Sequence, residues 1–193
     1  MMHPHTEIRF VSDEIGVGVF ATKFIPKGTI LWVLDDLDQI LDEDYVESLD
    51  TFRKDFIYKY SYQNENDQYV LCWDNGRYIN HSFLPNMIAT AYELELAARD
   101  IYPGEEITCD YGTLGDDESF HCVPEEGTTR TKVTAEDYLH CYQEWDEMAM
   151  EAFKYFNRVN QPLKHLIQKQ FVEKVNAVAE GREPLDSIRS TFE

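Results

Sequence analysis

The stretch GRYINHSFLPNM, from Gly76 to Met87, places two asparagines, a histidine and a proline among apolar neighbours. Once this stretch is buried, the hydrogen bonds of Asn80 and His81 must be satisfied by the protein itself or by a bound molecule. In an isolated Asn-His-Ser sequence, a turn that satisfies its own polar groups is the more common outcome. The other motifs of the chain favour a bound molecule.

The composition is that of a folded domain with an acidic surface. Of the 193 residues, 43% are hydrophobic and 13% aromatic, which supports a core and argues against disorder. The 37 acidic and 17 basic residues disfavour binding to nucleic acid or an anionic membrane and favour a basic partner. The four cysteines lack CxxC spacing, and no apolar signal or membrane-spanning run is found. We therefore expect an intracellular protein, cytoplasmic or nuclear.

The first part of the chain has the pattern of short strands, and the last third has the pattern of helices. Up to about residue 112, apolar runs are separated by Gly, Pro, Asn and Asp. Within this part, residues 35–50 are expected to include a short helix, and the alternating aromatic residues of 56–63 predict a strand. The spacing of apolar residues predicts one helix over 134–159, opened by a capping box of Thr134 and Asp137. It predicts a second helix over 162–179.

Three motifs follow one another: GVGVFATKFIPKGTIL at 16–31, GRYINHSFLPNM at 76–87 and ARDIYPGEEITCDYG at 98–112. Together they resemble the SET-domain family of protein-lysine methyltransferases, over roughly residues 8–112. Each motif alone is weak evidence, whereas the three in this order are specific. The resemblance implies a mainly β fold, a SET-type β-clip of small curved sheets. In that fold, the third motif passes beneath the second in a knot-like threading, and an α-helical C-terminal extension follows.

The resemblance and the change in composition divide the chain into three parts. Residues 1–115 are expected to form the SET domain, 116–133 a post-SET-like connector, and 134–193 the helical extension. Many family members carry a cysteine-rich zinc segment after the SET domain, whereas this connector holds only Cys122, beside His121. One Cys and one His cannot build a tetrahedral zinc site, so no metal is expected. The C-terminal helices are expected to replace the zinc scaffold and to offer a homodimer contact.

The resemblance implies S-adenosylmethionine as the cofactor. Gly16, Val17 and Gly18 would contact its amino-acid end through their main chain, because glycines at this spacing allow a backbone to approach a ligand closely. The side chain of Asn80 suits a ligand ammonium, since it offers both an acceptor and a donor. His81 would offer its backbone groups to the adenine and brace the loop with its ring.

The resemblance also makes Tyr111 the expected catalytic residue. Methyl transfer from a sulfonium to an amine is an in-line displacement, so the Tyr111 hydroxyl and backbone carbonyls would mainly align the reactants. The lysine must be neutral to attack, and we therefore expect a narrow apolar channel that disfavours its ammonium form. Tyr58, Tyr60 and Phe120 are the expected aromatic residues at the substrate.

Two further positions allow alternatives. Arg77 would support either the cofactor carboxylate or the packing of its motif, and the sequence does not separate these roles. Cys109 stands where many family members carry Phe or Tyr. Its small side chain leaves room in the substrate channel for a lysine with more than one methyl group, unless Tyr58 or Tyr60 fills the space.

The expected function is S-adenosylmethionine-dependent methylation of lysine in a basic protein segment, of which a histone-like tail is one form. The run from Asp35 to Asp50 holds eight carboxylates and no Lys or Arg, and it is either a solvated face or a surface that steers a cationic peptide. One alternative function is a catalytically weak binding module for basic peptides on the same scaffold. Another is a β-rich domain of the antifreeze-like type, in which the NHS and DYG motifs have no place.

Overall fold

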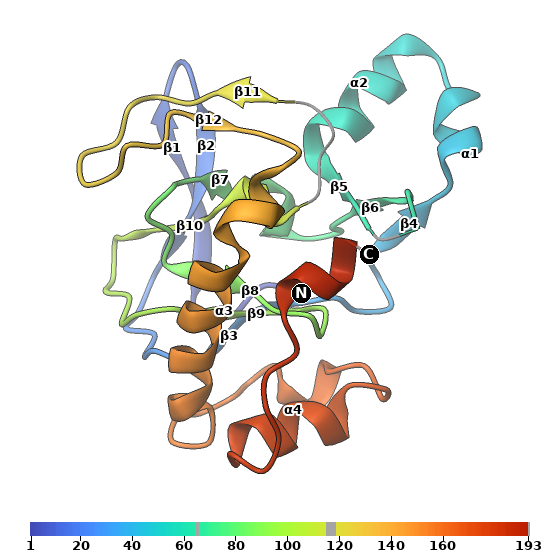
Figure 1. Cartoon of the computed structure of the whole chain (residues 1–193). Helices are drawn as coiled ribbons and strands as arrows, with labels where there is room; N and C mark the ends of the chain where they lie inside the picture. Colours follow the sequence, from blue (N-terminus) through green and yellow to red (C-terminus); the bar gives the residue numbers. More distant parts are fainter. Residues whose placement is uncertain (65, 115–118, 193) are drawn as a thin grey trace.

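The computed structural model describes residues 1–64, 66–114 and 119–192. These residues form four small sheets, with helices at two sides of them (Figure 1). The largest sheet has the order β1-β2-β10-β7. Its strands are β1 (Thr6–Ser12), β2 (Gly16–Ala21), β10 (Glu106–Cys109) and β7 (Asn80–His81).

The other sheets have two or three strands each. The β3-β9-β8 sheet consists of β3 (Ile30–Val33), β9 (Leu94–Ala97) and β8 (Met87–Ala89). The β4-β6-β5 sheet consists of β4 (Gln39–Leu41), β6 (Tyr69–Leu71) and β5 (Ser61–Gln63). A hairpin of β11 (Phe120–His121) and β12 (Lys132–Val133) follows the third motif.

Strand β10 brings the second and third motifs together. It pairs with β2 in antiparallel orientation and with β7 in parallel orientation, so that it lies between them. Its residues Thr108 and Cys109 lie opposite Asn80 and His81. The expected passage of the third motif beside the second is therefore confirmed, and so is the mainly β fold with a helical C-terminal extension.

The α-helices come from two parts of the chain, one within the β region and one after it. The α-helices are α1 (Glu43–Glu47), α2 (Thr51–Tyr60), α3 (Asp137–Phe156) and α4 (Val172–Ala179). The 3-10 helices are η1 (Asn75–Tyr78), η2 (Tyr111–Thr113), η3 (Lys164–Leu166) and η4 (Ile188–Phe192). No helix in the described ranges is both long and apolar enough to cross a membrane.

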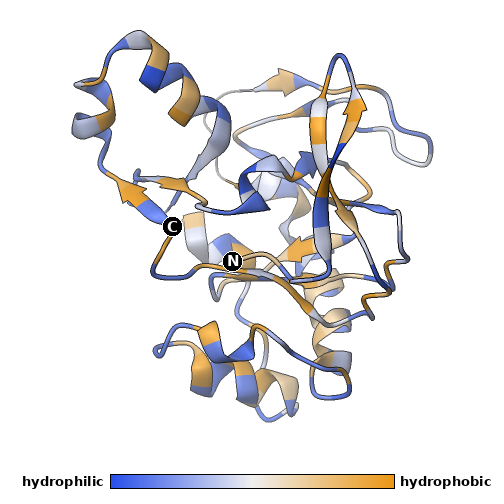
Figure 2. Ribbon diagram, turned by 180° about the vertical axis from the view of Figure 1, so that it is seen from behind, coloured by the Kyte–Doolittle hydropathy of each residue, from blue (hydrophilic) through white to orange (hydrophobic). Residues whose placement is uncertain are grey.

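One core joins α3 and α4 to the β3-β9-β8 sheet. Trp145, Ala149 and Ala152 recur on one face of α3 and pack with buried residues of that sheet such as Ile88 and Leu96. Apolar residues also gather in the strands, among them β2, β3 and β10 (Figure 2). The helical extension is thus part of the folded body. A homodimer contact through its helices and the predicted domain boundaries stay predictions.

The predicted strand over 56–63 is wrong for most of its length. Residues up to Tyr60 belong to α2, and only 61–63 form a strand, β5. The Asp50 side chain caps the helix by accepting a hydrogen bond from the Arg53 N–H, at 3.1 Å. The alternating aromatics also fit a helix, because Phe56 and Tyr60 are four residues apart and their ring centroids lie 4.9 Å from each other.

The predicted helix over 162–179 is interrupted. It consists of η3 and the later helix α4, which ends before Gly181 as expected. The preceding Gln161 is held by the sheet region instead, since its side chain accepts from the Ile30 N–H at 2.9 Å and donates to the Gly28 carbonyl at 2.7 Å. The first helix begins later than predicted, at Asp137. Thr134 contacts the Asp137 carboxylate through its N–H and its hydroxyl, so the capping box is only half formed.

Gly28 couples the β region to α3, and its replacement tests this packing. Its φ is +83°, and an added Cβ would lie 2.6 Å from the Ala152 carbonyl oxygen. We expect Gly28→Ala to lower the free energy of unfolding by about 2–4 kcal/mol, through backbone strain and the displaced helix. Gly181→Ala is the control, because Gly181 has a φ of +69° but open space around its Cβ. Equal losses in the two variants, measured by denaturant unfolding, would contradict the packing argument.

Candidate functional site

The site is built around the turn that carries Tyr111. The Tyr111 N–H donates to Nδ1 of His81 at 3.1 Å, and the Tyr111 hydroxyl donates to the Ile79 carbonyl at 2.6 Å. The imidazole therefore holds the backbone of the turn, while the carbonyl fixes the direction of the phenol. Because Nδ1 accepts, the His81 proton lies on Nε2, and burial lowers the pKa of this histidine, which keeps it neutral.

The glycine motif forms a cradle of oxygen atoms beside Asn80. The Asn80 amide donates to the Val17 carbonyl at 3.1 Å and to the Glu106 carboxylate at 2.7 Å. A Cβ on Gly18 would collide with that carboxylate and lie 2.7 Å from Asn80 Nδ2, so only glycine fits here. Gly16 turns the chain into β2 with a φ of +90°. The carbonyl, the carboxylate and the free amide oxygen of Asn80 are acceptors of the kind that an ammonium group requires.

A cavity of about 280 Å³ lies beside the Tyr111 turn. It collects all the residues that the sequence assigned to substrate and catalysis, together with Arg77. The lining residues that the sequence predicted are Tyr58, Tyr60, Arg77, Cys109, Tyr111 and Phe120. Four of the predicted cofactor residues are not among its lining residues: Gly16, Gly18, Asn80 and His81. The structure therefore separates these cofactor residues from the predicted substrate residues.

Arg77 makes contacts within its own motif. Its Nη1 donates to the carbonyls of Cys72 and Trp73, both at 3.2 Å, and its guanidinium lies over the ring of Tyr78 at 5.0 Å. These contacts correspond to the packing role that the sequence left open. The remaining Nε lies next to the cavity, since Arg77 is among its lining residues.

The cavity is not wholly apolar, contrary to the expected channel. Three of the side chains that line the cavity each carry a buried polar atom with no hydrogen-bond partner within the described residues. These atoms are Trp32 Nε1, Arg77 Nε and Glu95 Oε2. A buried polar atom of this kind is normally satisfied by water or a ligand. Glu95 was not predicted as a site residue. It belongs to the alternating sequence YELEL, whose glutamates have the pattern of a solvated strand face.

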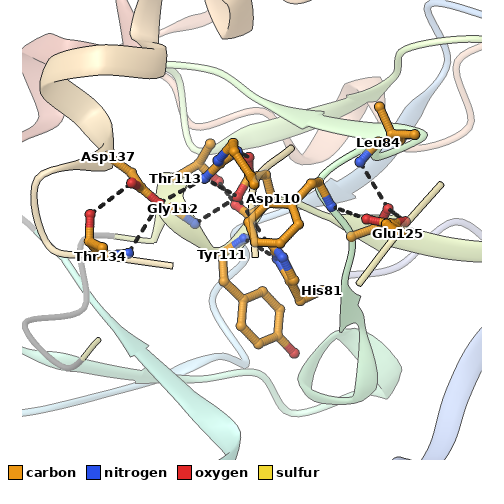
Figure 3. A network of polar contacts seen from close by, with 12 residues as sticks. His81, Leu84, Asp110, Tyr111, Gly112, Thr113, Glu125, Thr134 and Asp137 are labelled. Atoms are coloured by element: carbon orange, nitrogen blue, oxygen red, sulfur yellow. Dashed lines mark hydrogen bonds and ion pairs between the residues drawn. The ribbon is translucent and has the colours of Figure 1, made fainter. Parts of the chain in front are cut away.

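The connector between the third motif and α3 is held by an ion-pair network, as Figure 3 shows around Asp110. Arg130 pairs through Nη1 with the buried Asp110 and through Nη2 with Asp137 at 2.7 Å. Asp110 also accepts from Trp145 Nε1 at 3.2 Å and from the Gly112 N–H at 3.0 Å. The network therefore ties the connector, the Tyr111 turn and α3 together.

A second contact closes the connector over the second motif. The Glu125 carboxylate accepts hydrogen bonds from the Ser82 hydroxyl and from the Phe83 N–H, the latter at 2.7 Å. The ring of Phe120 then lies 6.0 Å from that of Tyr111. In the described part of the chain, no three His, Cys, Asp or Glu side chains are placed to hold a metal ion. The protein thus positions this segment with carboxylates and one arginine.

Comparisons with known proteins place this geometry in a family. The sequence model of the SET domain matches residues 16–112, which is half of the chain and contains all three motifs. Among solved structures, the chain is similar to that of a Plasmodium falciparum protein named as a candidate histone methyltransferase. The identity is 21%, the TM-score 0.41, and the match covers 57% of this chain and 95% of the other. No curated protein sequence gives a significant match. Because the family match spans half of the sequence, the chain belongs to the SET domain family.

Proposed function

We propose that the chain is an S-adenosylmethionine-dependent protein-lysine N-methyltransferase. The observation that carries the proposal is the position of the segment from β7 to the Tyr111 turn. The oxygen cradle of Gly18 and Asn80 adjoins this segment, and so does the cavity lined by Cys109 and Tyr111. Two reactants bound in these places would meet at Tyr111, as a transfer between them requires.

The cradle fits the amino-acid end of the cofactor. The Val17 carbonyl, the Asn80 side chain and the Glu106 carboxylate offer oxygens to its ammonium group, and the absent side chain of Gly18 gives the Glu106 and Asn80 side chains their space. The buried Nε2 of His81 has no partner within the described ranges, which adds one donor nearby. When bound, S-adenosylmethionine supplies an electrophilic methyl group on a sulfonium.

The protein's own part in the reaction is alignment. The Tyr111 hydroxyl donates its proton to the Ile79 carbonyl, which fixes the direction of the phenol, and its oxygen is proposed to accept a hydrogen bond from a substrate amine. That contact would direct the nitrogen lone pair, because the amine N–H and the lone pair have a fixed angle between them. The aromatic walls of the cavity exclude water around the amine.

A basic peptide is the proposed substrate. The formal net charge is -20, and the acidic run from Asp35 to Asp50 adjoins α2, whose Tyr58 and Tyr60 line the cavity. Tyr58 also donates to the Glu47 carboxylate at 2.5 Å, so the acidic segment and the cavity wall are in contact. Binding of a cationic peptide would therefore weaken as ionic strength rises.

The proposed function is tested by incubating the protein with labelled S-adenosylmethionine and a panel of basic proteins and peptides. Transfer of label to lysine supports it, whereas peptide binding without transfer would identify a binding module instead. Mass spectrometry of the product counts the methyl groups. Because Cys109 is small, we propose that the product goes beyond monomethyl-lysine, although Tyr58 and Tyr60 line the same cavity.

Replacing Asn80 by alanine tests the cofactor cradle. We expect Asn80→Ala to weaken S-adenosylmethionine binding by about 10-fold or more, since a hydrogen bond to a charged group contributes about 1.5–3 kcal/mol. Calorimetric titration measures the change. Asn157→Ala is the control, because that amide donates to the Ala179 carbonyl, far along the helical extension. Unchanged affinity in Asn80→Ala would remove this residue from the cofactor site.

A further inference from the structure

The cavity beside Tyr111 contains a carboxylate to which the proposed function gives no role. Glu95 on β9 lies directly opposite Trp32 on β3, so the two side chains project from the same face of the sheet. Both line the cavity, together with Tyr62, Cys109 and Tyr111. Glu95 Oε2 is buried and accepts no hydrogen bond from the residues that the structure describes. A hydrogen-bond donor on a bound molecule would satisfy this oxygen.

Within the residues that the structure describes, Glu95 has no ion-pair partner. The titratable groups that interact with it electrostatically are acidic or neutral: Glu93, Tyr62, Cys72 and Cys109. Lys59 and Arg77 line the same cavity, but within the described ranges neither forms an ion pair with Glu95. Burial, and secondarily the charge of Glu93, raises the pKa of Glu95 to about 7.

The other walls of the cavity favour an organic cation. Trp32 and Tyr62 meet edge to face, with centroids 6.2 Å apart, and further aromatic rings come from α2 and from the Tyr111 turn. Aromatic faces attract an ammonium group when it is removed from water. A divalent metal would need more oxygen ligands than the single carboxylate offers. The chemistry of the cavity therefore matches a primary ammonium on an alkyl chain.

We propose that Glu95 binds the ammonium group of the substrate lysine in this cavity and accepts its proton. This role rests on the proposed function. The step balances, because the nitrogen gives one proton to Oε2, the carboxylate becomes a carboxylic acid, and the nitrogen keeps its lone pair. Burial disfavours both charges of the initial ion pair and so favours the neutral amine and acid. One side chain thus attracts the charged substrate and yields the neutral amine that methyl transfer needs.

The first test measures binding alone, with n-butylammonium and the neutral 1-butanol as probes. By NMR titration at pH 8, we expect the wild type to bind n-butylammonium at least fivefold more tightly than 1-butanol. Glu95→Gln should bind both probes within twofold of each other, and Glu93→Gln, the matched control, should keep the preference. The wild-type preference should fall as the pH drops through about 7, because Glu95 gains a proton there. Equal affinity of the wild type for the two probes would overturn the inference.

The second test measures methyl transfer to a basic peptide. We expect Glu95→Gln to lower kcat at least 10-fold and to raise KM, whereas Glu93→Gln stays within threefold of the wild type. An unchanged kcat in Glu95→Gln overturns the proton-accepting role. If the wild type methylates no lysine but still prefers n-butylammonium, the proposed function fails and the cation site stands.

A folding control separates these outcomes from simple damage to the protein. In the folded state the pKa of Glu95 is raised to about 7, so wild-type stability falls as the pH rises from the ordinary range of a glutamate through about 7, and at pH 8 this contribution is lost. Glu95→Gln removes the buried charge and keeps the shape of the side chain. Its unfolding midpoint at pH 8 should therefore match or exceed that of the wild type. A lower midpoint at pH 8 would contradict the assignment of Glu95 as an unpaired buried carboxylate.

Discussion

Tyr111→Phe is expected to lower kcat for methyl transfer by about 100-fold or more, while the affinity for S-adenosylmethionine stays within about twofold. The hydroxyl is held by the Ile79 carbonyl, and its oxygen is proposed to orient the amine in the transition state. The phenyl ring of the variant still packs near His81 and Phe120, so the turn should keep its shape. Steady-state kinetics with a basic peptide and calorimetry with the cofactor give the two quantities.

Tyr102→Phe is the matched control for this experiment. Tyr102 is 57% exposed and lies outside the cavity, so the loss of its hydroxyl should leave both quantities unchanged. If Tyr111→Phe instead weakens cofactor binding as much as it slows transfer, the hydroxyl has a structural role in both states. A kcat within threefold of the wild type would remove Tyr111 from the reaction altogether.

The sequence predicted short strands up to about residue 112, because the Gly, Pro, Asn and Asp residues between them are local signals. Gly16 and Gly18 bound and shape β2, and Asn80 and His81 form a strand that is only two residues long. The pairing of that strand with β10 could not be read from periodicity, since two residues carry no alternation. The family resemblance implied only that the third motif passes beneath the second. The structure adds the pairing itself, with Thr108 opposite Asn80.

The errors arose where tertiary contacts outweigh the local pattern. In residues 56–60, alternation of aromatic residues was compatible with a strand, but the Asp50 cap selects a helix. At Gln161, side-chain hydrogen bonds to Gly28 and Ile30, more than 130 positions earlier in the sequence, hold the chain ahead of the interrupted helix. No Pro or Gly within residues 51–60 marks the extent of α2, and none within residues 167–171 marks the interruption between η3 and α4.

Glu95 shows why the candidate site was only partly predictable. The alternation in YELEL agrees with the structure, where Leu94 and Leu96 lie in the core and Glu95 lies on the opposite face of β9. The sequence cannot tell whether that face meets water or other elements of the fold. Here Trp32 and Tyr62 cover it, and a residue with the pattern of a solvated glutamate lines the cavity instead. Cavities formed by distant segments require the tertiary structure.

The connector gives the second large expected effect. Arg130→Met should lower the free energy of unfolding by about 3–5 kcal/mol, because it leaves the buried Asp110 without its cation. Arg182→Met is the control, since Arg182 pairs with Glu180 at the surface and such pairs contribute about 0–1 kcal/mol. Denaturant unfolding measures both variants. Amide hydrogen exchange should also quicken over residues 119–133, where the connector loses its anchor.

The double variant Arg130→Met with Asp110→Asn separates charge from packing. If the cost of Arg130→Met comes mainly from an uncompensated buried charge, the neutral amide should restore part of the lost stability, about 1–2 kcal/mol. Only one of the hydrogen bonds that Asp110 accepts can remain, because the Gly112 N–H bonds to Oδ1 and Trp145 Nε1 to Oδ2, and an asparagine has a single acceptor oxygen. The loss of the other bond is why only part of the stability should return. A double variant no more stable than Arg130→Met would mean that the arginine acts by filling space over Phe83, 4.4 Å from its guanidinium. The ion pairs of Arg130 would then not be what anchors the connector.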